Sequence, residues 1–461
     1  MRYISTRGGI EPVAFREALM MGLARDGGLI LPERYPDVSG RLAAWRGLSY
    51  AELAFEIMRL YATDIPEAEL RRMVGEAYAT FDHPEVTPVR KVGDLYILEL
   101  FHGPTLAFKD VALQMLGRLF EYQLEAEGGE LNIVAATSGD TGSAAIHGVR
   151  GRKRQRIFVM HPAGKVSPVQ EMQMTSVTDD NVFNLAVSGT FDDCQDIVKT
   201  LFRDLAFRDA HRLGAVNSIN WARVMAQVTY YFYAAFRAQE ATECTTVNFT
   251  VPTGNFGDIF AGYVAVRMGL PVSKLLLATN ENDILARFFQ SGEYALGKVH
   301  QSLSPSMDIQ IASNFERYLY HRSGDDAALL TQWMETFAKD GKLTIPHNDA
   351  LFEGGRGDTA MTLAAIKDTY ERHGYLLDPH TAVGVSVAQT RRDTNIPMIC
   401  LATAHPAKFP DAIAAATGQA GLATHPSIEA LRDKPRRCTP VPADAKRVAD
   451  YLRRHIYSVL P

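Results

Sequence analysis

From about residue 131 onward, short runs of apolar and β-branched residues alternate with longer stretches whose apolar residues recur every three or four positions. This alternation constrains the fold most, because it is typical of parallel strands joined by helical crossovers. The strands that it predicts lie at 131–137, 156–161, 182–189, 245–253, 274–280 and 397–404. The clearest helices lie at 192–207 and 221–239. The sequence therefore predicts an α/β protein with mainly parallel sheets.

The first ninety-odd residues differ from the rest, because their pattern is mostly helical. Two stretches, 50–62 and 66–81, carry the clearest helical spacing. A chain of 461 residues with 46% hydrophobic content can form two or three units, since single cores rarely grow beyond about 250 to 300 residues. We therefore expect an N-terminal helical cap followed by α/β domains.

The charge balance argues against a polyanionic partner. The chain has 48 basic and 53 acidic residues, a net charge of −5, which gives no field that attracts nucleic acid or anionic lipid. Its one dense basic run, residues 150–156, precedes a predicted strand and is expected to solvate a loop. No apolar run approaches the roughly 18 residues that span a bilayer, and the N-terminus lacks the apolar core of a signal peptide. We expect no nucleic-acid partner and no membrane partner.

The four cysteines point to a reducing compartment. Cys194, Cys244, Cys400 and Cys438 lie far apart in the sequence and form no zinc-like spacing. Free thiols persist where the surroundings are reducing. We expect a cytoplasmic protein without a metal site, and the sequence leaves open whether it is a monomer or a homodimer.

Two glycine-rich turns follow predicted strands. The first is "TSGDTGSAA" at 137–145, and the second is "PTGNFGDIFAGY" at 252–263. Backbone N–H groups at such a turn, together with the dipole of the following helix, bind carboxylates or phosphates. An ordinary capped turn, with Ser138 or Asp140 as the N-cap, explains the first one about as well. Two such turns after parallel strands favour anion binding.

Three further groups contain candidate residues. Ser218 and Arg223 are five apart in "NSINWARVMAQ" and can converge on one phosphate, although a surface arginine beside a helix cap is the simpler explanation. The segment "DPHTAVG" at 378–384 joins a histidine and a threonine to a helix start. The segment "ATAHPAKFPDA" at 402–412 places Thr403 at the end of a buried strand, followed by a histidine of a kind that is often structural.

The segment "HGPTLAFKD" places one lysine, Lys109, after a turn-forming glycine-proline pair and a short apolar run. An amine among apolar residues loses hydration of its charged form, so the free amine becomes available as a nucleophile and base. Combined with turns that bind a phosphate, this is what a Schiff-base enzyme of pyridoxal phosphate requires. A surface lysine is the commoner alternative for any single lysine.

Taken together, these motifs resemble the threonine synthase family. "HGPTLAFKD" is similar to the segment that carries the cofactor lysine in that family. Other segments similar to the family, in the same order, are "YISTRG", "GLARDGGLILPE", "TSGDTGSAA", "PTGNFGD", "DPHTAVG" and "ATAHPAKFP". The resemblance runs from Tyr3 to about Asp411, and the opening segments resemble the longer enzymes of bacteria and fungi. One departure is the segment 351–366, which is more glycine-rich and less acidic than expected, so that a loop there is expected to differ.

The resemblance implies a fold and a domain division. The implied fold is the tryptophan-synthase-β-like fold of pyridoxal-phosphate enzymes (fold type II), with two α/β domains of mainly parallel sheets and an N-terminal, mostly helical cap. The cap would comprise residues 1–95. Residues 96–245 would carry the cofactor lysine and the substrate carboxylate site, and residues 246–461 would carry the cofactor phosphate site and the C-terminal segment.

The resemblance also implies roles residue by residue. Lys109 would hold pyridoxal 5'-phosphate covalently, Asp140 would flank the ring, and Thr403 would face the pyridine nitrogen. A hydroxyl in that place leaves the nitrogen mostly unprotonated and favours elimination over transamination. The residues implied for the cofactor phosphate are Gly254, Asn255, Phe256 and Gly257. Those implied for the substrate carboxylate are Ser138, Gly139 and Thr141, and those for the substrate phosphate are Ser218, Arg223 and Asn255.

The function that follows from the resemblance is the last step of threonine biosynthesis: O-phospho-L-homoserine and water give L-threonine and phosphate by γ-elimination and β-addition of water. This makes the chain a carbon–oxygen lyase acting on phosphates. A related phospholyase or dehydratase that releases a keto acid and ammonia is the nearest alternative. A noncatalytic protein of the same fold is a second alternative, which the intact Lys109 and both glycine turns oppose. An NAD enzyme is excluded, because no GxGxxG motif follows the relevant strands.

Overall fold

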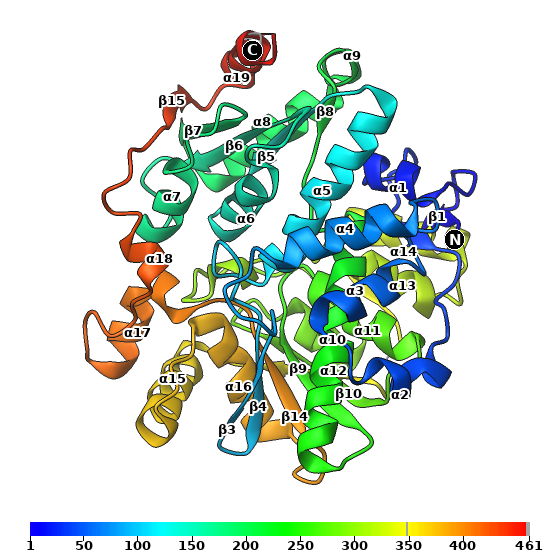
Figure 1. Ribbon diagram of the computed structural model, residues 1–461, viewed down its shortest axis with the longest axis vertical. Helices are drawn as coiled ribbons and strands as arrows, with labels where there is room; N and C mark the ends of the chain where they lie inside the picture. The colour runs from blue at the N-terminus through cyan, green and yellow to red at the C-terminus, as the bar shows by residue number, and fades with distance from the viewer. Residues whose placement is uncertain (347–348, 458–461) are drawn as a thin grey trace. The chain divides into compact units, whose positions relative to one another are not determined.

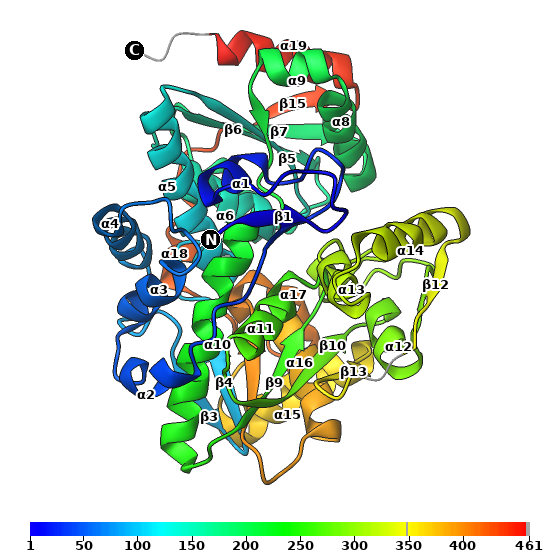
Figure 2. The same ribbon diagram turned by 90° about the vertical axis from the view of Figure 1, so that its right-hand side faces the viewer.

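The chain forms two α/β units, each built from two separate stretches of sequence (Figures 1 and 2). The computed structural model describes residues 1–346 and 349–457. Unit 1 comprises Met1–Phe108 and Ser218–Ala423, and unit 2 comprises Lys109–Asn217 and Thr424–Pro461. Packing thus groups the chain into two units. The sequence led us to expect three consecutive segments, which were defined by function: 1–95, 96–245 and 246–461. That functional division stays a prediction.

A six-stranded sheet forms the centre of unit 1. Its strands, in spatial order, are β13 (Phe352–Arg356), β10 (Val272–Thr279), β9 (Val247–Pro252), β14 (Met398–Ala402), β4 (Leu95–Glu99) and β3 (Val89–Val92). All neighbours pair in parallel except β3 with β4, which is antiparallel. Two antiparallel pairs complete the strands of unit 1: β1 (Tyr3–Ser5) with β2 (Ile30–Pro32), and β11 (Glu293–Ala295) with β12 (Lys342–Thr344).

Helices cover both faces of this sheet, because successive side chains of a strand point to opposite faces. Leu276 and Ala278 of β10 belong to the core cluster beneath α15 (Thr359–His373) and α16 (Pro379–Arg391). Leu275 points the other way, toward α11 (Gly257–Arg267), which packs beside α10 (Trp221–Thr242). Unit 1 also contains α1 (Phe15–Met21), α2 (Leu42–Trp45), α3 (Tyr50–Met58), α4 (Glu67–Tyr78), α12 (Ile284–Ser291), α13 (Phe315–Arg322), α14 (Ala327–Asp340), α17 (Pro410–Thr417) and the short helices η1 (Ser39–Arg41), η2 (Pro305–Met307) and η3 (Pro406–Lys408).

The carboxyl ends of three neighbouring strands meet at one edge of this sheet. Strands β9, β14 and β4 run parallel to one another. The segments that follow them are 253–256, Thr403 and 100–108, respectively. Ligands of open α/β sheets bind at this edge, so the fold brings three of the predicted motifs to the place where a ligand is expected.

Unit 2 contains an all-parallel sheet of five strands. Their spatial order is β15 (Thr439–Pro442), β7 (Val182–Ser188), β6 (Gln155–Pro162), β5 (Leu131–Ala136) and β8 (Leu213–Gly214). Its helices are α5 (Lys109–Glu127), α6 (Asp140–Val149), α7 (Pro168–Thr175), α8 (Phe191–Arg203), α9 (Leu205–Ala210), α18 (Pro426–Glu429) and α19 (Ala445–Ile456).

The expected α/β class and all six predicted strands are confirmed, and one local prediction is corrected. The helix predicted over 192–207 is two helices, because α8 ends at Arg203 and the side chain of Asp204 caps α9. The glycine-rich segment 351–366 contains strand β13 and the start of α15. The expectation that a loop in this segment differs from the family stays a prediction.

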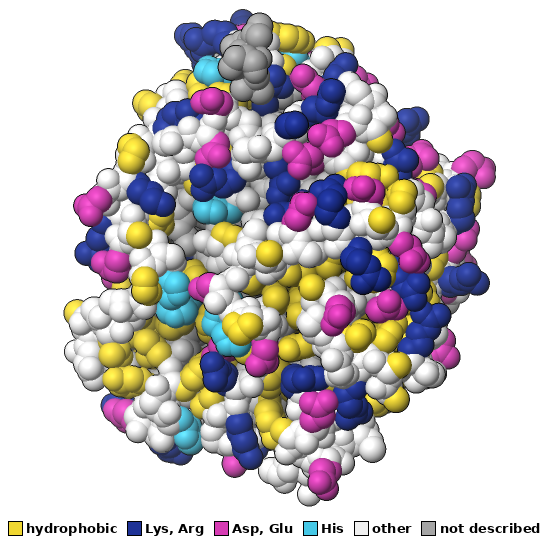
Figure 3. Space-filling model, viewed as in Figure 1, with side chains coloured by type: hydrophobic (Ala, Val, Ile, Leu, Met, Phe, Trp, Pro, Cys, Tyr) yellow, Lys and Arg dark blue, Asp and Glu magenta, His cyan; other side chains and the backbone are white. Residues whose placement is uncertain are grey.

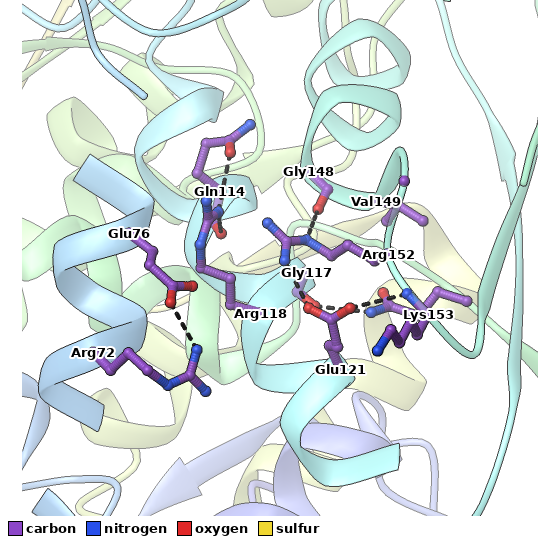
Figure 4. Close-up of polar contacts among 12 residues, drawn as sticks. Arg72, Glu76, Gln114, Gly117, Arg118, Glu121, Gly148, Val149, Arg152 and Lys153 are labelled. Atoms are coloured by element: carbon purple, nitrogen blue, oxygen red, sulfur yellow. Dashed lines mark hydrogen bonds and ion pairs between the residues drawn. The ribbon is translucent and has the colours of Figure 1, made fainter. Parts of the chain in front are cut away.

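The basic run at 150–156 is paired with acidic side chains of unit 2. Figure 4 shows Arg152 and Lys153 at Glu121: Nη1 of Arg152 lies 2.8 Å from Oε2 of Glu121, and the amide of Lys153 donates to the same carboxylate. Arg156 pairs likewise with Glu130 at 3.0 Å. Acidic and basic side chains also intermingle over the face seen in Figure 3, as the small net charge suggests.

Among residues 1–346 and 349–457, no helix is long and apolar enough to cross a membrane. The same residues contain no cluster of three or more His, Cys, Asp or Glu side chains arranged to hold a metal ion.

Candidate active site

Lys109, the first residue of α5, is a buried amine with 8% exposure. Its Nζ lies 3.5 Å from Oδ2 of Asp140, which begins α6 in the same unit. The other carboxylate oxygen accepts a hydrogen bond from Nε2 of Gln170 at 2.8 Å. A buried ion pair needs such additional hydrogen bonds to offset its lost hydration. Lys109 is therefore held inside the protein by a polar partner, and the surface-lysine alternative is wrong.

The first glycine turn joins β5 to α6 through a conformation that requires glycine. Gly139 has φ +145°, and a Cβ there would lie 2.2 Å from Oε1 of Gln170. The hydroxyl of Thr137 accepts hydrogen bonds from the amides of Gly139 and Gly142, at 3.0 and 2.9 Å. Neither Ser138 nor Asp140 is the N-cap; Gly139 occupies that position. The capped-turn alternative is thus wrong as stated, and the exposed Ser138 is left available for a ligand.

Thr141 follows in the first turn of α6 and is partly exposed. Gln170 and Thr137, which fix this turn, were not expected from the sequence. Thr137 lies within the motif, but the sequence pattern assigns no role to it, and Gln170 is 30 residues from the carboxylate that it holds.

The second glycine turn joins β9 to α11 and leaves the helix start uncapped. Phe256 is the N-cap with φ +63°, and within the described chain no side chain caps the first turn. A Cβ at Gly254 would lie 2.6 Å from the backbone oxygen of Ser306, and one at Gly257 would lie 3.1 Å from Nδ2 of Asn314. The backbone N–H groups at an uncapped helix start can bind an anion. The turn therefore has the shape and the donors that a phosphate requires.

Polar side chains lie beside this turn in unit 1. Oγ of Ser313 donates to Oδ1 of Asn255 at 3.2 Å and lies 3.5 Å from Oγ of Ser218. The backbone carbonyl of Asn255 accepts hydrogen bonds from the amide and from Nδ2 of Asn314, at 3.0 and 3.1 Å. The structure thus brings the predicted Ser218 and Asn255 together through Ser313. A role for Ser313 or Asn314 could not be predicted, because they lie in a segment without a recognisable motif.

Arg223, in the first turn of α10, is buried without a protein partner for two of its nitrogens. Its exposure is 4%, and Nε and Nη1 form no hydrogen bond within the described residues. Burial lowers the pKa of Arg223 to about 10, so the side chain is charged at neutral pH. A buried cation without a counter-charge is costly. The surface-arginine alternative is therefore wrong, and the unpaired nitrogens point to an anionic ligand.

Ser218 precedes the helix that carries Arg223. Asn220 caps α10, and its side chain accepts a hydrogen bond from the amide of Ala222 at 3.0 Å. As expected from the sequence, Ser218 thus lies outside the helix while Arg223 lies within it.

Thr403 follows β14 at the carboxyl edge of the sheet. Its amide donates to Oγ1 of Thr381 at 3.2 Å, and its carbonyl accepts the amide of Phe108 at 2.8 Å. Its own hydroxyl forms no hydrogen bond to any residue that the structure describes. Phe108 is bonded directly to Lys109, so the Cα atoms of these two residues are about 3.8 Å apart.

The "DPHTAVG" segment connects Thr403 with the segment that contacts the second glycine turn. Asp378 caps α16 and accepts hydrogen bonds from the side chains of His380 and Thr381. Nε2 of His380 in turn accepts the amide of Ser306 at 3.3 Å, next to the atom that Gly254 approaches. The buried histidine is thus a structural contact.

A buried carboxyl lies just inside α11. Oδ1 of Asp258 accepts the hydroxyls of Tyr230 at 2.5 Å and Tyr231 at 3.0 Å, while Oδ2 has no partner among the described residues. Burial raises the pKa of Asp258 to about 6. Burial therefore makes ionisation of this carboxyl less favourable in the folded chain than in the unfolded chain.

These residues fit pyridoxal phosphate by their chemistry. Lys109 supplies an amine for the aldehyde, the uncapped start of α11 supplies donors for the phosphate, and the hydroxyl of Thr403 can bond to a ring nitrogen. The glycine at position 254 leaves a space that any other side chain would fill.

Comparisons with known proteins agree with this assignment. Residues 2–78 match the family "Threonine synthase N terminus", residues 81–346 match "Pyridoxal-phosphate dependent enzyme", and residues 381–452 match "Threonine synthase, C-terminal". Threonine synthase of Pseudomonas aeruginosa is 47% identical, with 99% of this chain and 98% of the relative covered. Threonine synthase of Schizosaccharomyces pombe is also 47% identical, with 89% and 88% covered.

A solved structure agrees over the whole length. The crystal structure of pyridoxal-phosphate-bound threonine synthase from Brucella melitensis has a TM-score of 0.96 and 48% identity, and the match covers 99% of this chain and 100% of the other. The expected fold type is thereby confirmed. On this sequence and structural likeness, the chain belongs to the threonine synthase family of pyridoxal-phosphate dependent enzymes.

Proposed function

We propose that the chain converts O-phospho-L-homoserine and water into L-threonine and phosphate, as the name of its relatives suggests. The observation that carries this proposal is the buried guanidinium of Arg223, whose Nε and Nη1 have no partner in the described chain. A phosphorylated substrate supplies two negative charges and several acceptor oxygens, and a guanidinium binds such a group with a planar pair of donors. Burial then becomes favourable, because the ligand replaces the missing counter-charge.

The residues proposed to hold the cofactor lie at the start of α5, in the two glycine turns and after β14. Lys109 binds it covalently, the backbone of Gly254, Asn255, Phe256 and Gly257 binds its phosphate, Thr403 bonds to the ring nitrogen and Asp140 flanks the ring. Support comes from the buried amine, the uncapped helix start and the free hydroxyl described above. When bound, pyridoxal phosphate supplies an electron sink for the pair of electrons that a substrate Cα–H bond releases.

The substrate-binding residues are proposed from the two glycine turns and α10. Ser138, Gly139 and Thr141 would bind the α-carboxylate, and this is supported by the exposed hydroxyl of Ser138 and the turn that Thr137 holds open. Ser218, Arg223 and Asn255 would bind the phosphate, and this is supported by the contact of Ser218 and Asn255 with Ser313.

Lys109 and Arg223 would then perform the chemistry. The amine of Lys109 takes the proton from Cα and then one from Cβ, since a free lysine amine is a competent base once its charge is poorly solvated. Arg223 holds the phosphate as it leaves Cγ, where negative charge develops and fixed donors lower the barrier most. A proton returns to Cγ, water adds to Cβ and provides the hydroxyl of the product, and a second proton returns to Cα. Asp140, fixed by Gln170, keeps the lysine near its place while it gains and loses protons.

A turnover assay tests the proposal directly. Purified protein loaded with pyridoxal phosphate is incubated with O-phospho-L-homoserine, and phosphate, threonine and ammonia are measured together. We expect phosphate and threonine in equal amounts. Ammonia and a keto acid in place of threonine would identify the alternative, a phospholyase. If the protein releases phosphate from none of the phosphorylated amino acids tested, it does not catalyse the proposed reaction.

We also propose a cytoplasmic enzyme that acts on a small molecule and has no nucleic-acid partner. The four cysteines are free thiols, as a reducing compartment requires. Three arginines of the basic run, Arg150, Arg152 and Arg156, pair with carboxylates of unit 2. Monomer and homodimer are both compatible with the reaction, and sedimentation of the purified protein distinguishes them.

A further inference from the structure

Residues 103–108, which lead to Lys109 and are called the lysine segment below, contain a strained turn. The amide of Leu106 donates to the carbonyl of Gly103 at 3.0 Å, and Leu106 has φ +59°. A branched side chain in this left-handed region is unusual and costs free energy, so it persists only where neighbouring contacts enforce it. Leu106 is also 2% exposed, so its side chain is packed in the interior. Contacts with residues 403–408 keep this turn closed.

Residues 403–408, called the clamp turn below, hold the lysine segment along its length. The carbonyl of Leu106 accepts the amide of His405 at 3.0 Å. The carbonyl of Thr403 accepts the amide of Phe108 at 2.8 Å, and an isolated antiparallel bridge lies between these two contacts. The two segments thus form a short ladder that begins at the strained residue and ends one residue before Lys109.

A buried lysine of the clamp turn completes this ladder. Lys408, the last residue of η3, has 0% exposure, and its Nζ donates to the carbonyl of Thr105 at 2.7 Å. Lysine is almost never fully buried unless its ammonium is bonded. The carbonyl that it holds is the one immediately before Leu106. Lys408 therefore bonds the backbone of the clamp turn's partner segment on the N-terminal side of the strained residue.

We propose that Lys408 is a positioning residue for Lys109, an inference that rests on the proposed covalent role of Lys109. By holding Thr105, the ammonium of Lys408 keeps Leu106 in its left-handed conformation. Lys109 follows Leu106 by three positions, so a change of φ at Leu106 displaces the start of α5 by several ångströms at about 3.8 Å per residue. The same clamp turn carries Thr403, whose hydroxyl is proposed to bond to the ring nitrogen.

The test compares Lys408→Met with a matched control. Methionine keeps an unbranched apolar chain of similar length but removes the donor. Lys274→Met is the control, because Nζ of Lys274 also donates to a backbone carbonyl of unit 1, that of Ala350 at 2.6 Å. Both variants are prepared with pyridoxal phosphate, and turnover, the visible circular dichroism of the bound cofactor and the share of chains that borohydride fixes at Lys109 are measured.

We expect Lys408→Met to lower kcat about tenfold or more with KM changed less than about threefold, because misplacement of a reacting group by about 1 Å can cost about 100-fold in rate. The cofactor dichroism and the trapped share at Lys109 should fall, while all three readouts stay at the wild-type level in Lys274→Met. If Lys408→Met does not accumulate as folded protein, Lys408→Gln is measured in its place. A normal kcat and normal dichroism in the measured variant would overturn the proposal.

A second background separates positioning from general destabilisation. Glycine adopts φ +59° without strain, so in a Leu106→Gly background the turn needs less holding. There Lys408→Met should lower kcat by a smaller factor than in the wild type. An equal factor in both backgrounds would overturn the role of the strained turn. If borohydride fixes the cofactor on a residue other than Lys109 in the wild type, the proposed function of Lys109 fails instead, and this is seen before any variant is compared.

Discussion

Lys109 and Asp140 form a buried ion pair in which Nζ lies 3.5 Å from Oδ2. The distance is long for a charge-assisted hydrogen bond, which is usually about 2.7 to 2.9 Å. Gln170 fixes the opposite oxygen of Asp140 at 2.8 Å, so the carboxylate is oriented by a group other than the lysine. The carboxylate that faces the amine is thus held in place by a second partner, so the counter-charge of Lys109 has a fixed orientation.

Lys109→Ala should abolish the covalent attachment of pyridoxal phosphate and reduce kcat by several orders of magnitude, because the variant lacks both the attachment point and the proposed base. The cofactor should still bind weakly through its phosphate. Borohydride reduction followed by peptide mass mapping should place the cofactor on Lys109 in the wild type and on no residue in the variant. Lys339→Ala, at an exposed lysine of α14, is the control. Activity retained in Lys109→Ala would remove the central residue of the proposed site.

Gly254→Ala should weaken cofactor binding, because the new Cβ would lie 2.6 Å from the backbone oxygen of Ser306 and the turn must open to accommodate it. We expect the cofactor dissociation constant to rise about tenfold or more, equivalent to about 1.4 kcal/mol or more. Titration of the apoenzyme with pyridoxal phosphate measures this. Gly75→Ala is the matched control, since a Cβ at Gly75 meets nothing within 4 Å in α4. Unchanged affinity in Gly254→Ala would mean that this turn binds another ligand.

Much of the fold was predictable because local sequence and tertiary packing agree. The runs that form β5, β9 and β14 are apolar and β-branched, and a turn signal follows each. The start of α10 was equally readable, because Asn220 is a typical capping residue and leaves Ser218 outside the helix.

Strand β13 could not be predicted, because close packing overrides its composition. Gly354 and Gly355 weaken β propensity, yet both lie in a strand paired with β10. A Cβ at Gly354 would lie 2.7 Å from the carbonyl oxygen of Ala286, and one at Gly355 would lie 2.3 Å from Cγ1 of Val387. Two helices approach the strand from opposite faces, so the glycines mark a tight contact and not a loop.

The partners of the candidate site residues were hidden for a different reason. Gln170 holds Asp140 from 30 residues away, and Ser313 holds Asn255 from 58 residues away. No sequence pattern links the two members of such a pair, because they come together only in the folded chain. Glycine turns and the lysine can be recognised from spacing, whereas the side chains that orient them require the structure.

Asp258→Asn should alter how stability depends on pH. In the unfolded chain this carboxyl has an ordinary pKa of 3.8, and burial raises the pKa to about 6 in the folded chain. The folded state therefore favours the protonated form, and the stability this provides is fully present below about pH 4 and is lost as pH rises through about 6. The difference between these two pKa values corresponds to about 3 kcal/mol in the free energy of unfolding.

The measurement is urea unfolding of both proteins between pH 5 and pH 8. The wild type should lose stability across this range relative to the variant, because asparagine cannot ionise while still accepting a hydrogen bond from Tyr230 or Tyr231. Parallel stability curves for the two proteins would contradict the assignment of this titration to Asp258.

Arg223→Ala should reduce kcat/KM about 100-fold or more, the size of effect seen when a single donor to a developing negative charge is removed. Part of the loss should fall on kcat, because the charge on the departing phosphate is largest in the transition state. Arg223→Lys keeps the charge but not the planar pair of donors, so a smaller loss of about tenfold is expected.

The matched control is Arg237→Ala, on the same helix α10, where the guanidinium pairs with Glu240 at 3.4 Å and lies near the surface. Its kcat/KM should stay at the wild-type value. The visible spectrum of the bound cofactor should be normal in all three variants, since neither arginine is assigned to the cofactor. Removing Arg223 also removes a buried cation that lacks a protein counter-charge, so the ligand-free alanine variant need not be less stable than the wild type. Substrate should therefore stabilise the wild type against unfolding more than it stabilises Arg223→Ala. Equal stabilisation of both by O-phospho-L-homoserine, together with equal kcat/KM, would show that Arg223 does not bind the substrate phosphate and would reopen the choice of a phosphorylated substrate.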